Sequence, residues 1–306
     1  MAAGRGLIIF PGALGDLICL LPAIRELGRR CPKIEFELMA RAELACFAAR
    51  RTTMVAGHSI DRREVALLFS ELSSESNLAR NFFQQFDRID CFFASDNERF
   101  CLSLRRAARS EVFFYPFRPH GRGHIAECYL REVGAPISRP RARTVEPLPQ
   151  DLLDAHEKLN ACGLEPGRFV LAFPGSGSAR KNWPAENFAL LAERIQSTHR
   201  VLVVLGPAEI TMAPTFNGRS LTVMSDIELG GLAAIARLAR CFIGNDSGVS
   251  HLAAAAGARG LVIFGPSNPE RWRPLGDVKI IRKEPLANLS LDQVWISVAE
   301  SICANQ

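Results

Sequence analysis

The sequence predicts an α/β protein with two doubly wound parallel sheets, one in each half of the chain. Short apolar runs alternate with segments of helical periodicity along the 306 residues, and this alternation is typical of parallel sheets covered by helices on both faces. Proline and polar residues are concentrated at positions 138–150, which indicates a linker. We therefore expect an N-terminal domain over residues 1–150 and a C-terminal domain over residues 151–306.

The N-terminal domain opens with a predicted strand at residues 6–10, a turn at 11–15 and a helix from residue 16 to about residue 30. Leucine or isoleucine occupies positions 17, 20, 21, 24 and 27 of this helix, which places one apolar stripe along it. Residues 40–120 show no clear period, and we expect irregular loops there.

The C-terminal domain repeats the pattern. Strands are expected at residues 169–173, 201–205, 241–244 and 261–264, and helices at 185–198, 229–239 and 247–256. Ligands of such sheets bind at the carboxyl ends of the strands. Two domains of this kind that face each other would form a ligand cleft, so the residues directly after strands are the candidates for chemistry.

Composition excludes several classes of protein. With 48% hydrophobic and 23% charged residues, the chain is neither disordered nor fibrous. Its apolar runs are much shorter than the roughly 20 residues that span a bilayer, and it opens without an apolar signal region, so we expect a cytoplasmic protein. The nine cysteines form no Cys-x-x-Cys pair, and we expect neither a zinc site nor a disulfide framework.

The net charge of +5 belongs to the first half, because residues 1–150 hold 22 Lys and Arg against 17 Asp and Glu. Clustered arginines suit an anionic partner. They lie at positions 105, 106, 109, 118, 122, 139, 141 and 143. No nucleic-acid-binding motif accompanies them, so a phosphorylated substrate or an anionic membrane surface is the expected partner, and nucleic acid is not.

The turn at residues 11–16 follows the first strand. Gly12 and Gly15 allow the backbone to approach a ligand closely. Asp16 either caps the helix that it opens or faces that ligand. The turn lacks both the Gly-x-Gly-x-x-Gly dinucleotide fingerprint and the Gly-Lys-Ser/Thr of a phosphate-binding loop.

A second loop, residues 173–184, follows the strand at 169–173. Gly175 and Ser176 expose backbone amides and a hydroxyl, and Arg180 and Lys181 bring positive charge to the start of a helix. The two cations are either solvated loop residues or ligands of an anion.

The third loop, residues 244–251, is the most specific of the three. Asp246, Ser247 and Gly248 open a helix whose free amides suit a diphosphate. His251, one turn further, is either a buried structural residue or a ligand contact. Glu209 follows the strand at 201–205, where acids of doubly wound folds accept ribose hydroxyls, although a surface glutamate would look the same.

Taken together, these loops resemble glycosyltransferase family 9, the lipopolysaccharide heptosyltransferases. The resemblance rests on Gly12-Ala-Leu-Gly-Asp16, Pro174-Gly175 with Lys181-Asn-Trp-Pro184, and Asn245-Asp-Ser-Gly248 with His251-Leu-Ala. It implies a GT-B fold and inverting transfer of a heptose from ADP-heptose to a core-oligosaccharide acceptor. It also implies that the final helix, about residues 290–303, returns to the N-terminal domain.

The resemblance assigns roles to individual residues. Asp16 matches the catalytic base and Lys181 the lysine that binds the donor phosphate, while Glu209 matches the ribose carboxylate. The implied donor-binding set is completed by Gly175, Ser176, Arg180, Ile227, Leu229, Asp246, Ser247, Gly248 and His251, and the acceptor side by Gly12, Ala13, Leu14 and Gly15.

The sequence contains no Asp-x-Asp metal-binding motif, so we expect backbone amides and Lys181 to stabilise the leaving diphosphate without a metal or another cofactor. Two other classes stay open: a nucleotide-sugar-binding protein without transferase activity, and a dinucleotide oxidoreductase. The acceptor, the sugar and the nucleotide base are not fixed by any single residue.

Overall fold

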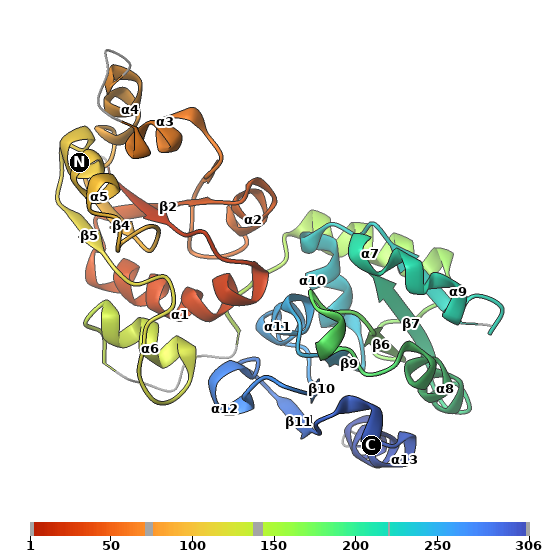
Figure 1. Ribbon diagram of the computed structural model, residues 1–306. Helices are drawn as coiled ribbons and strands as arrows, with labels where there is room; N and C mark the ends of the chain where they lie inside the picture. Colours follow the sequence, from red (N-terminus) through yellow and green to blue (C-terminus); the bar gives the residue numbers. More distant parts are fainter. Residues whose placement is uncertain (1–2, 71–75, 137–142, 220, 304–306) are drawn as a thin grey trace. The chain divides into compact units, whose positions relative to one another are not determined.

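The computed structural model describes residues 3–70, 76–136, 143–219 and 221–303, and the chain forms two compact units, Met1–Pro140 and Arg141–Gln306. Each unit is an α/β layer structure with a fully parallel sheet (Figure 1). The division falls ten residues before the boundary expected from the sequence. Thr144 and Val145 already belong to the second unit, because their backbone N–H groups both donate to the carbonyl of Ala255.

The first unit contains a five-stranded sheet of order β3-β2-β1-β4-β5. Its strands are β1 (Gly4–Ile9), β2 (Ile34–Ala40), β3 (Gly57–Ser59), β4 (Arg88–Cys91) and β5 (Val112–Phe114). Its helices are α1 (Leu14–Arg30), α2 (Ala42–Ala48), α3 (Arg63–Ala66), η1 (Leu67–Phe69), α4 (Ser76–Phe83), α5 (Glu98–Ala107) and α6 (Ile125–Glu132). Residues 40–120 hold short strands and helices, with irregular segments between them at residues 49–56, 92–97 and 115–120. The expected irregular loops are confirmed for these segments, whereas the regular elements of this region were not predicted; residues 71–75 lie outside the described part of the chain.

The alternation of side chains along β1 builds two cores. Leu7 and Ile9 join a cluster with Phe83, Phe86 and Phe100 on the face covered by η1, α4 and α5. On the opposite face α1 and α6 pack against each other, and the expected apolar stripe of α1 is buried.

An ionic network crosses β1, β2 and β3 within this unit. Glu37 is only 5% exposed and accepts a hydrogen bond from Arg5 Nε at 2.7 Å, while His58 Nε2 lies 2.6 Å from its other oxygen. Burial opposes ionisation of Glu37, but the hydrogen bonds from Arg5 and His58 and their charges outweigh it, so the pKa of Glu37 is lowered.

The second unit contains a six-stranded sheet of order β11-β10-β9-β6-β7-β8. Its strands are β6 (Phe169–Phe173), β7 (Arg200–Leu205), β8 (Thr222–Ser225), β9 (Cys241–Asn245), β10 (Gly260–Phe264) and β11 (Val278–Arg282). Its helices are α7 (Pro149–Ala161), η2 (Ala179–Lys181), α8 (Ala185–Ile195), η3 (Pro207–Met212), α9 (Ala213–Phe216), α10 (Leu229–Leu238), α11 (Gly248–Ala255), α12 (Pro269–Trp272), η4 (Leu286–Asn288) and α13 (Leu291–Cys303).

The four strands expected in this half are all present, and the two edge strands β8 and β11 complete the sheet. The central strands are buried on both faces, which explains their continuous apolar sequence. The described contacts of α13 are with α8, β9 and β10 of the same unit; its return to the N-terminal domain stays a prediction.

Every cysteine whose side chain the structure describes is a free thiol: Cys19, Cys31, Cys46, Cys91, Cys101, Cys128, Cys162 and Cys241. Within the described segments, no helix has the length and apolar character that crossing a bilayer requires.

Candidate active site

The turn after β1 holds the acceptor-side residues expected from the sequence. A side chain at Gly12 would place its Cβ 2.4 Å from the ring of Phe10 and 2.8 Å from Asp16 Cβ, so only glycine fits there. Ala13 is the N-cap of α1, and Leu14 and Gly15 form its first turn.

Asp16 lies in the first turn of α1 and is only 8% exposed. The prediction that Asp16 is the N-cap residue is therefore wrong, because the N-cap is Ala13. Asp16 Oδ2 nevertheless accepts the N–H of Ala13 at 3.4 Å, which satisfies one free donor of the helix end. The carboxylate is thus fixed close to the carboxyl end of β1.

Arg118 is a residue of this site that the sequence did not single out. It follows β5, and its Nη2 donates to both oxygens of Asp16 at 3.2 and 3.1 Å. Its side chain is 56% exposed and lies over the ring of Phe117. The sequence shows Arg118 as one of several clustered arginines that suit an anionic partner, and this cluster was the only signal, because the strand before it was not predicted.

In the second unit, the expected loops at residues 173–184 and 244–251 each contribute one charged residue to an ion pair. Lys181 Nζ donates to Asp246 Oδ2 at 2.8 Å, and Asp246 is 5% exposed. The two residues follow different strands, β6 and β9, so the ion pair lies at the carboxyl edge of this sheet. An ammonium group has three donors, and the 37% exposed side chain of Lys181 can bind a second anion.

Asn245 holds the loops around this pair. It is fully buried at the end of β9; its Nδ2 donates to the carbonyl of Pro174 at 2.7 Å, and its Oδ1 accepts the N–H of Trp183 at 3.0 Å. One side chain therefore fixes both ends of the loop that carries Lys181. From the sequence, Asn245 is expected only as part of a motif, without a role of its own.

The amino end of α11 is built as expected. Ser247 is the N-cap, and its Oγ accepts the N–H of Ser250 at 3.4 Å. Gly248 is the first residue of the helix, and His251 is 5% exposed within it. Ser250 Oγ donates to the carbonyl of Asn245 at 2.7 Å, which ties this helix to β9.

Glu209 and Gly175 are in direct contact. A Cβ at Gly175 would lie 2.0 Å from Glu209 Cγ, and one at Gly206 would lie 2.6 Å from Glu209 Oε2. The carboxylate of Glu209, in η3 after β7, therefore occupies the space that these glycines leave open. Ser176 donates to Asn182 Oδ1 at 2.6 Å and stiffens the loop on the other side.

The remaining expected donor residues are placed by their elements. Arg180 is exposed beside Lys181 in η2, Ile227 lies two residues after β8, and Leu229 begins α10. No described contact joins these three side chains to the Lys181–Asp246 pair. Among the residues that the structure describes, no three His, Cys, Asp or Glu side chains gather in a way that would hold a metal ion.

The sequence profile of glycosyltransferase family 9 (heptosyltransferase) matches residues 130–289, slightly more than half of the chain. The chain belongs to glycosyltransferase family 9. The matched segment carries Lys181, Glu209 and Asp246, whereas Asp16 lies before it. The protein is thus a glycosyltransferase, as its sequence motifs implied.

Relatives and solved structures agree with the family. Lipopolysaccharide heptosyltransferase 1 of Pseudomonas aeruginosa is 27% identical over 288 residues, with 87% of this chain and 79% of that protein covered. A family 9 glycosyl transferase of Veillonella parvula is similar in structure, with a TM-score of 0.80, 19% identity, and 100% and 99% of the two chains covered.

The ADP-heptose lipopolysaccharide heptosyltransferase II of E. coli has a TM-score of 0.78 and 16% identity, with 98% and 99% of the chains covered. These similarities confirm the predicted GT-B fold class for this family 9 glycosyltransferase.

Proposed function

We propose that this glycosyltransferase moves a heptose from ADP-heptose to a lipopolysaccharide core or another glycan acceptor, with inversion and without a metal or other cofactor. The names of the Pseudomonas aeruginosa and E. coli proteins support the sugar and the donor. The observation that carries the proposal is the Lys181–Asp246 pair beside the amino end of α11, because it sets a cation and free amides together at the carboxyl edge of a nucleotide-binding type of sheet.

On the donor side, Lys181 and the first amides of α11 bind the diphosphate in this proposal. Glu209 accepts the ribose hydroxyls, and Ile227 and Leu229 lie against the adenine. Ser176, Arg180 and His251 complete the donor contacts. Asp246 belongs to this donor-binding set and orients Lys181, whose Nζ donates to it.

On the acceptor side, Asp16 is the general base. Arg118 donates to both of its oxygens, but an ionised carboxylate offers about four acceptor positions, so an acceptor hydroxyl can still donate to it. Arg118 therefore orients the base without blocking it.

The reaction exchanges one bond of the anomeric carbon for another and moves one proton. The acceptor oxygen attacks the anomeric carbon, the bond from that carbon to the diphosphate breaks on the opposite face, and ADP leaves with the electron pair. The hydroxyl proton passes to Asp16 as the new C–O bond forms. Attack opposite to the leaving group inverts the anomeric centre.

Replacement of Asp16 tests this assignment. Asp16→Asn keeps the hydrogen-bonding shape of the side chain but removes the base, and general-base catalysis contributes about 10²–10⁴ in rate. We expect kcat to fall by about that factor while the Kd for ADP, measured by calorimetry, stays within twofold of wild type. Asp61→Asn, an exposed substitution in the first unit, is the matched control.

An Asp16→Asn enzyme with full turnover would refute the base. A wild-type protein that binds ADP but releases none from ADP-heptose with a heptose-free core acceptor would instead favour the nucleotide-sugar-binding alternative. A panel of ADP-, UDP- and GDP-sugars in the same assay identifies the donor.

Metal independence has its own test. Preorganised donors can each supply roughly 3–4 kcal/mol of transition-state stabilisation, so Lys181 and the α11 amides can meet the leaving charge. We expect the initial rate to be unchanged in excess EDTA. Loss of activity in EDTA that added Mg²⁺ or Mn²⁺ restores would refute this part of the proposal.

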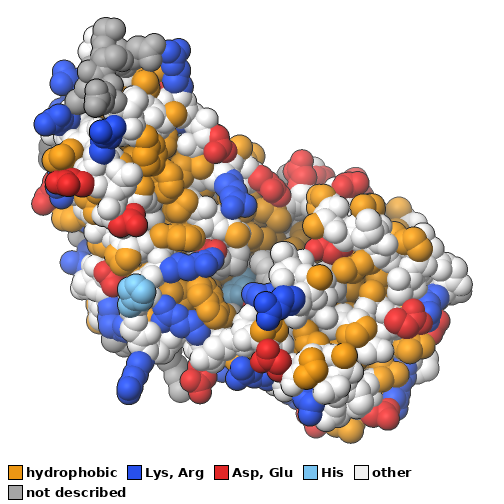
Figure 2. Space-filling view, in the orientation of Figure 1, with side chains coloured by type: hydrophobic (Ala, Val, Ile, Leu, Met, Phe, Trp, Pro, Cys, Tyr) orange, Lys and Arg blue, Asp and Glu red, His pale blue; other side chains and the backbone are white. Residues whose placement is uncertain are grey.

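We also place the protein in the cytoplasm, in peripheral contact with the inner membrane. Leu78, Leu102 and Phe69 are 40%, 43% and 39% exposed on the neighbouring elements α4, α5 and η1, and Arg105 and Arg106 end α5. Figure 2 shows hydrophobic and basic side chains interspersed over the first unit. Such a surface suits anionic lipid, so sedimentation with phosphatidylglycerol vesicles should be lost in Arg105→Gln/Arg106→Gln and retained in Arg29→Gln.

A further inference from the structure

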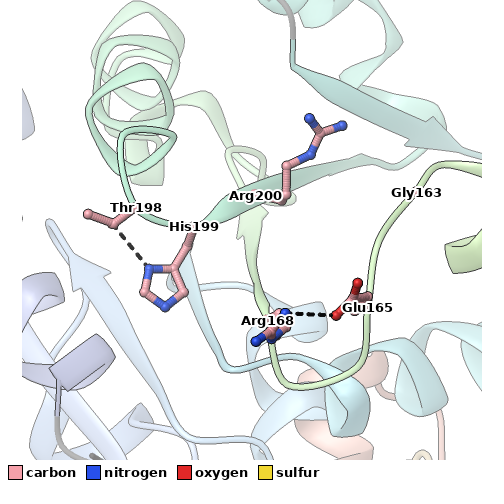
Figure 3. A pocket seen from close by; sticks show the side chains of 6 residues that line it. All are labelled: Gly163, Glu165, Arg168, Thr198, His199 and Arg200. Carbon is pink, nitrogen blue, oxygen red and sulfur yellow. Dashed lines mark hydrogen bonds and ion pairs between the residues drawn. The ribbon is translucent and has the colours of Figure 1, made fainter.

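The pocket of about 390 Å³ in Figure 3 lies at the amino ends of β6 and β7, away from the donor loops. Glu165 and Arg168 in its wall form an ion pair at 3.1 Å, and His199 Nδ1 lies 3.1 Å from Thr198 Oγ1. The guanidinium groups of Arg168 and Arg200 do not converge on one point (Figure 3), so no ligand follows from these side chains. The first unit, by contrast, contains a continuous series of contacts that ends at the proposed base.

Arg118 lies in a loop that two prolines restrict. Pro116 and Pro119 flank Phe117 and Arg118. A proline fixes its own φ and favours an extended conformation in the residue before it. The position of Arg118 therefore depends closely on the position of Phe117.

Tyr129 of α6 holds Phe117 in place. Its side chain is completely buried, and its hydroxyl donates to the carbonyl of Phe117 at 2.8 Å. The rings of Phe117 and Tyr129 both lie edge-on to the ring of Phe10, with centroid distances of 5.6 and 6.3 Å. Phe10 also leaves no room for a side chain at Gly12. The turn after β1 and the loop that carries Arg118 therefore pack on the same ring.

Helix α6 also fixes the far end of this loop. Arg131 Nη2 donates to the carbonyl of Arg122 at 2.7 Å. The same helix packs against α1, which carries Asp16. One helix thus positions the loop of Arg118 relative to the helix of Asp16.

We propose that Tyr129 is a positioning residue of the transferase reaction, which acts through Phe117 and Arg118 on the orientation of Asp16. This inference rests on the proposed function, in which Asp16 is the general base. Arg118 donates to both oxygens of Asp16 and so sets the direction in which the carboxylate faces an acceptor hydroxyl, a geometry on which base catalysis depends. Without the Tyr129 hydroxyl, Arg118 is held less firmly and Asp16 adopts the reactive orientation less often.

Tyr129→Phe tests the proposal, because it removes the hydroxyl and keeps the ring. Loss of one hydrogen bond corresponds to a change of about 3- to 10-fold. We expect kcat to fall by this factor, while the Kd for ADP in calorimetry stays within twofold of wild type. Arg118→Ala should lower kcat at least as much, and adding Tyr129→Phe to Arg118→Ala should cause no further fall, because the hydroxyl acts through the arginine.

Tyr115→Phe is the matched control. Tyr115 is the other tyrosine of the chain, and its hydroxyl donates to the buried carboxylate of Asp90 at 2.9 Å. The substitution removes a buried hydrogen bond that holds Asp90 rather than Phe117. We therefore expect the thermal midpoint to fall and kcat to stay at the wild-type value.

NMR of the Arg118 Nε–H group reports its contact with Asp16 without turnover. We expect Asp16→Asn and Tyr129→Phe to shift this resonance and Tyr115→Phe to leave it in place. The proposal is overturned by an unshifted resonance or wild-type kcat in Tyr129→Phe, or by losses in Tyr129→Phe and Arg118→Ala that multiply in the double variant. Full turnover of Asp16→Asn, with the Arg118 resonance shifted as expected, would instead refute the base, and Tyr129 would then have no base to position.

Discussion

At the scale of single residues, the contact between Gly175 and Glu209 explains why position 175 is a glycine: the space that a larger side chain would fill is occupied by Glu209. The sequence predicts Gly175 as a source of backbone amides and Glu209 as a ribose-binding acid, with no link between the two residues. The structure makes them one feature, because the space of a missing side chain is filled by the carboxylate. The position of Glu209 therefore depends on a residue 34 positions before it.

Substitution of Gly175 tests this dependence. In Gly175→Ala the new methyl would lie 2.0 Å from Glu209 Cγ, so the glutamate must move, and the hydrogen bonds to ribose that we propose for it would be lost. Hydrogen bonds to charged groups contribute about 1.5–3 kcal/mol, so we expect ADP binding to weaken by roughly 10- to 100-fold in calorimetry.

Gly177→Ala is a control in the same loop, since nothing lies within 4 Å of its added Cβ. We expect it to bind ADP as wild type does. Equal affinities of the two variants would show that Glu209 does not contact the nucleotide.

At the scale of elements, Asn245 connects three of them: β9, the end of β6 through Pro174, and the segment before α8 through Trp183. Its loss would leave a buried amide and a buried carbonyl without partners. Unsatisfied buried groups cost about 1–3 kcal/mol each. The two hydrogen bonds of Asn245 thus determine both the conformation of the loop that carries Lys181 and the stability of this edge of the sheet.

Asn245→Ala should lower the free energy of unfolding of the second unit by about 2–5 kcal/mol and raise the KM for the donor more than it lowers kcat. Urea unfolding followed by tryptophan emission measures the first effect, because Trp183, Trp272 and Trp295 all lie in this unit. Asn160→Ala, an exposed change on α7, should leave both values unaltered. An Asn245→Ala protein of normal stability would contradict the assigned hydrogen bonds.

The central strands were predictable from sequence because β6, β9 and β10 are buried on both faces and therefore continuously apolar. The strands β3 and β5 have only three residues each, and β8 is half-buried, so neither length nor period revealed them. Arg118 could not be assigned, because its contact with Asp16 joins residues 102 positions apart. Local patterns carry no information on such pairings.

At the scale of the whole molecule, one acid-sensitive element is the ionic network of the first unit. Glu37 of the first unit has a lowered pKa in the folded state, so it contributes stability above its unfolded pKa of about 4.5. This contribution is lost as the pH falls from that value through the folded pKa.

We expect the first unit to lose stability below about pH 4.5, and Glu37→Gln to make this dependence shallower and to cost about 1–3 kcal/mol at pH 7. Hydrogen exchange in β2 measures the first unit, while tryptophan emission follows the second unit as an internal reference. Glu157→Gln on α7, an exposed site, is the matched control. An unchanged pH profile in Glu37→Gln would exclude this network as the acid-sensitive element.

The ion pair of Lys181 and Asp246 has a consequence for inhibitor chemistry. A purely anionic compound that binds the ammonium group of Lys181 competes for it with Asp246, which is almost completely buried. Separation of the lysine from this buried carboxylate would cost free energy. A zwitterion that offers phosphate to the lysine and an amine to the aspartate would leave neither charge alone. Compounds of that kind should therefore be more selective for this enzyme than simple nucleotide analogues.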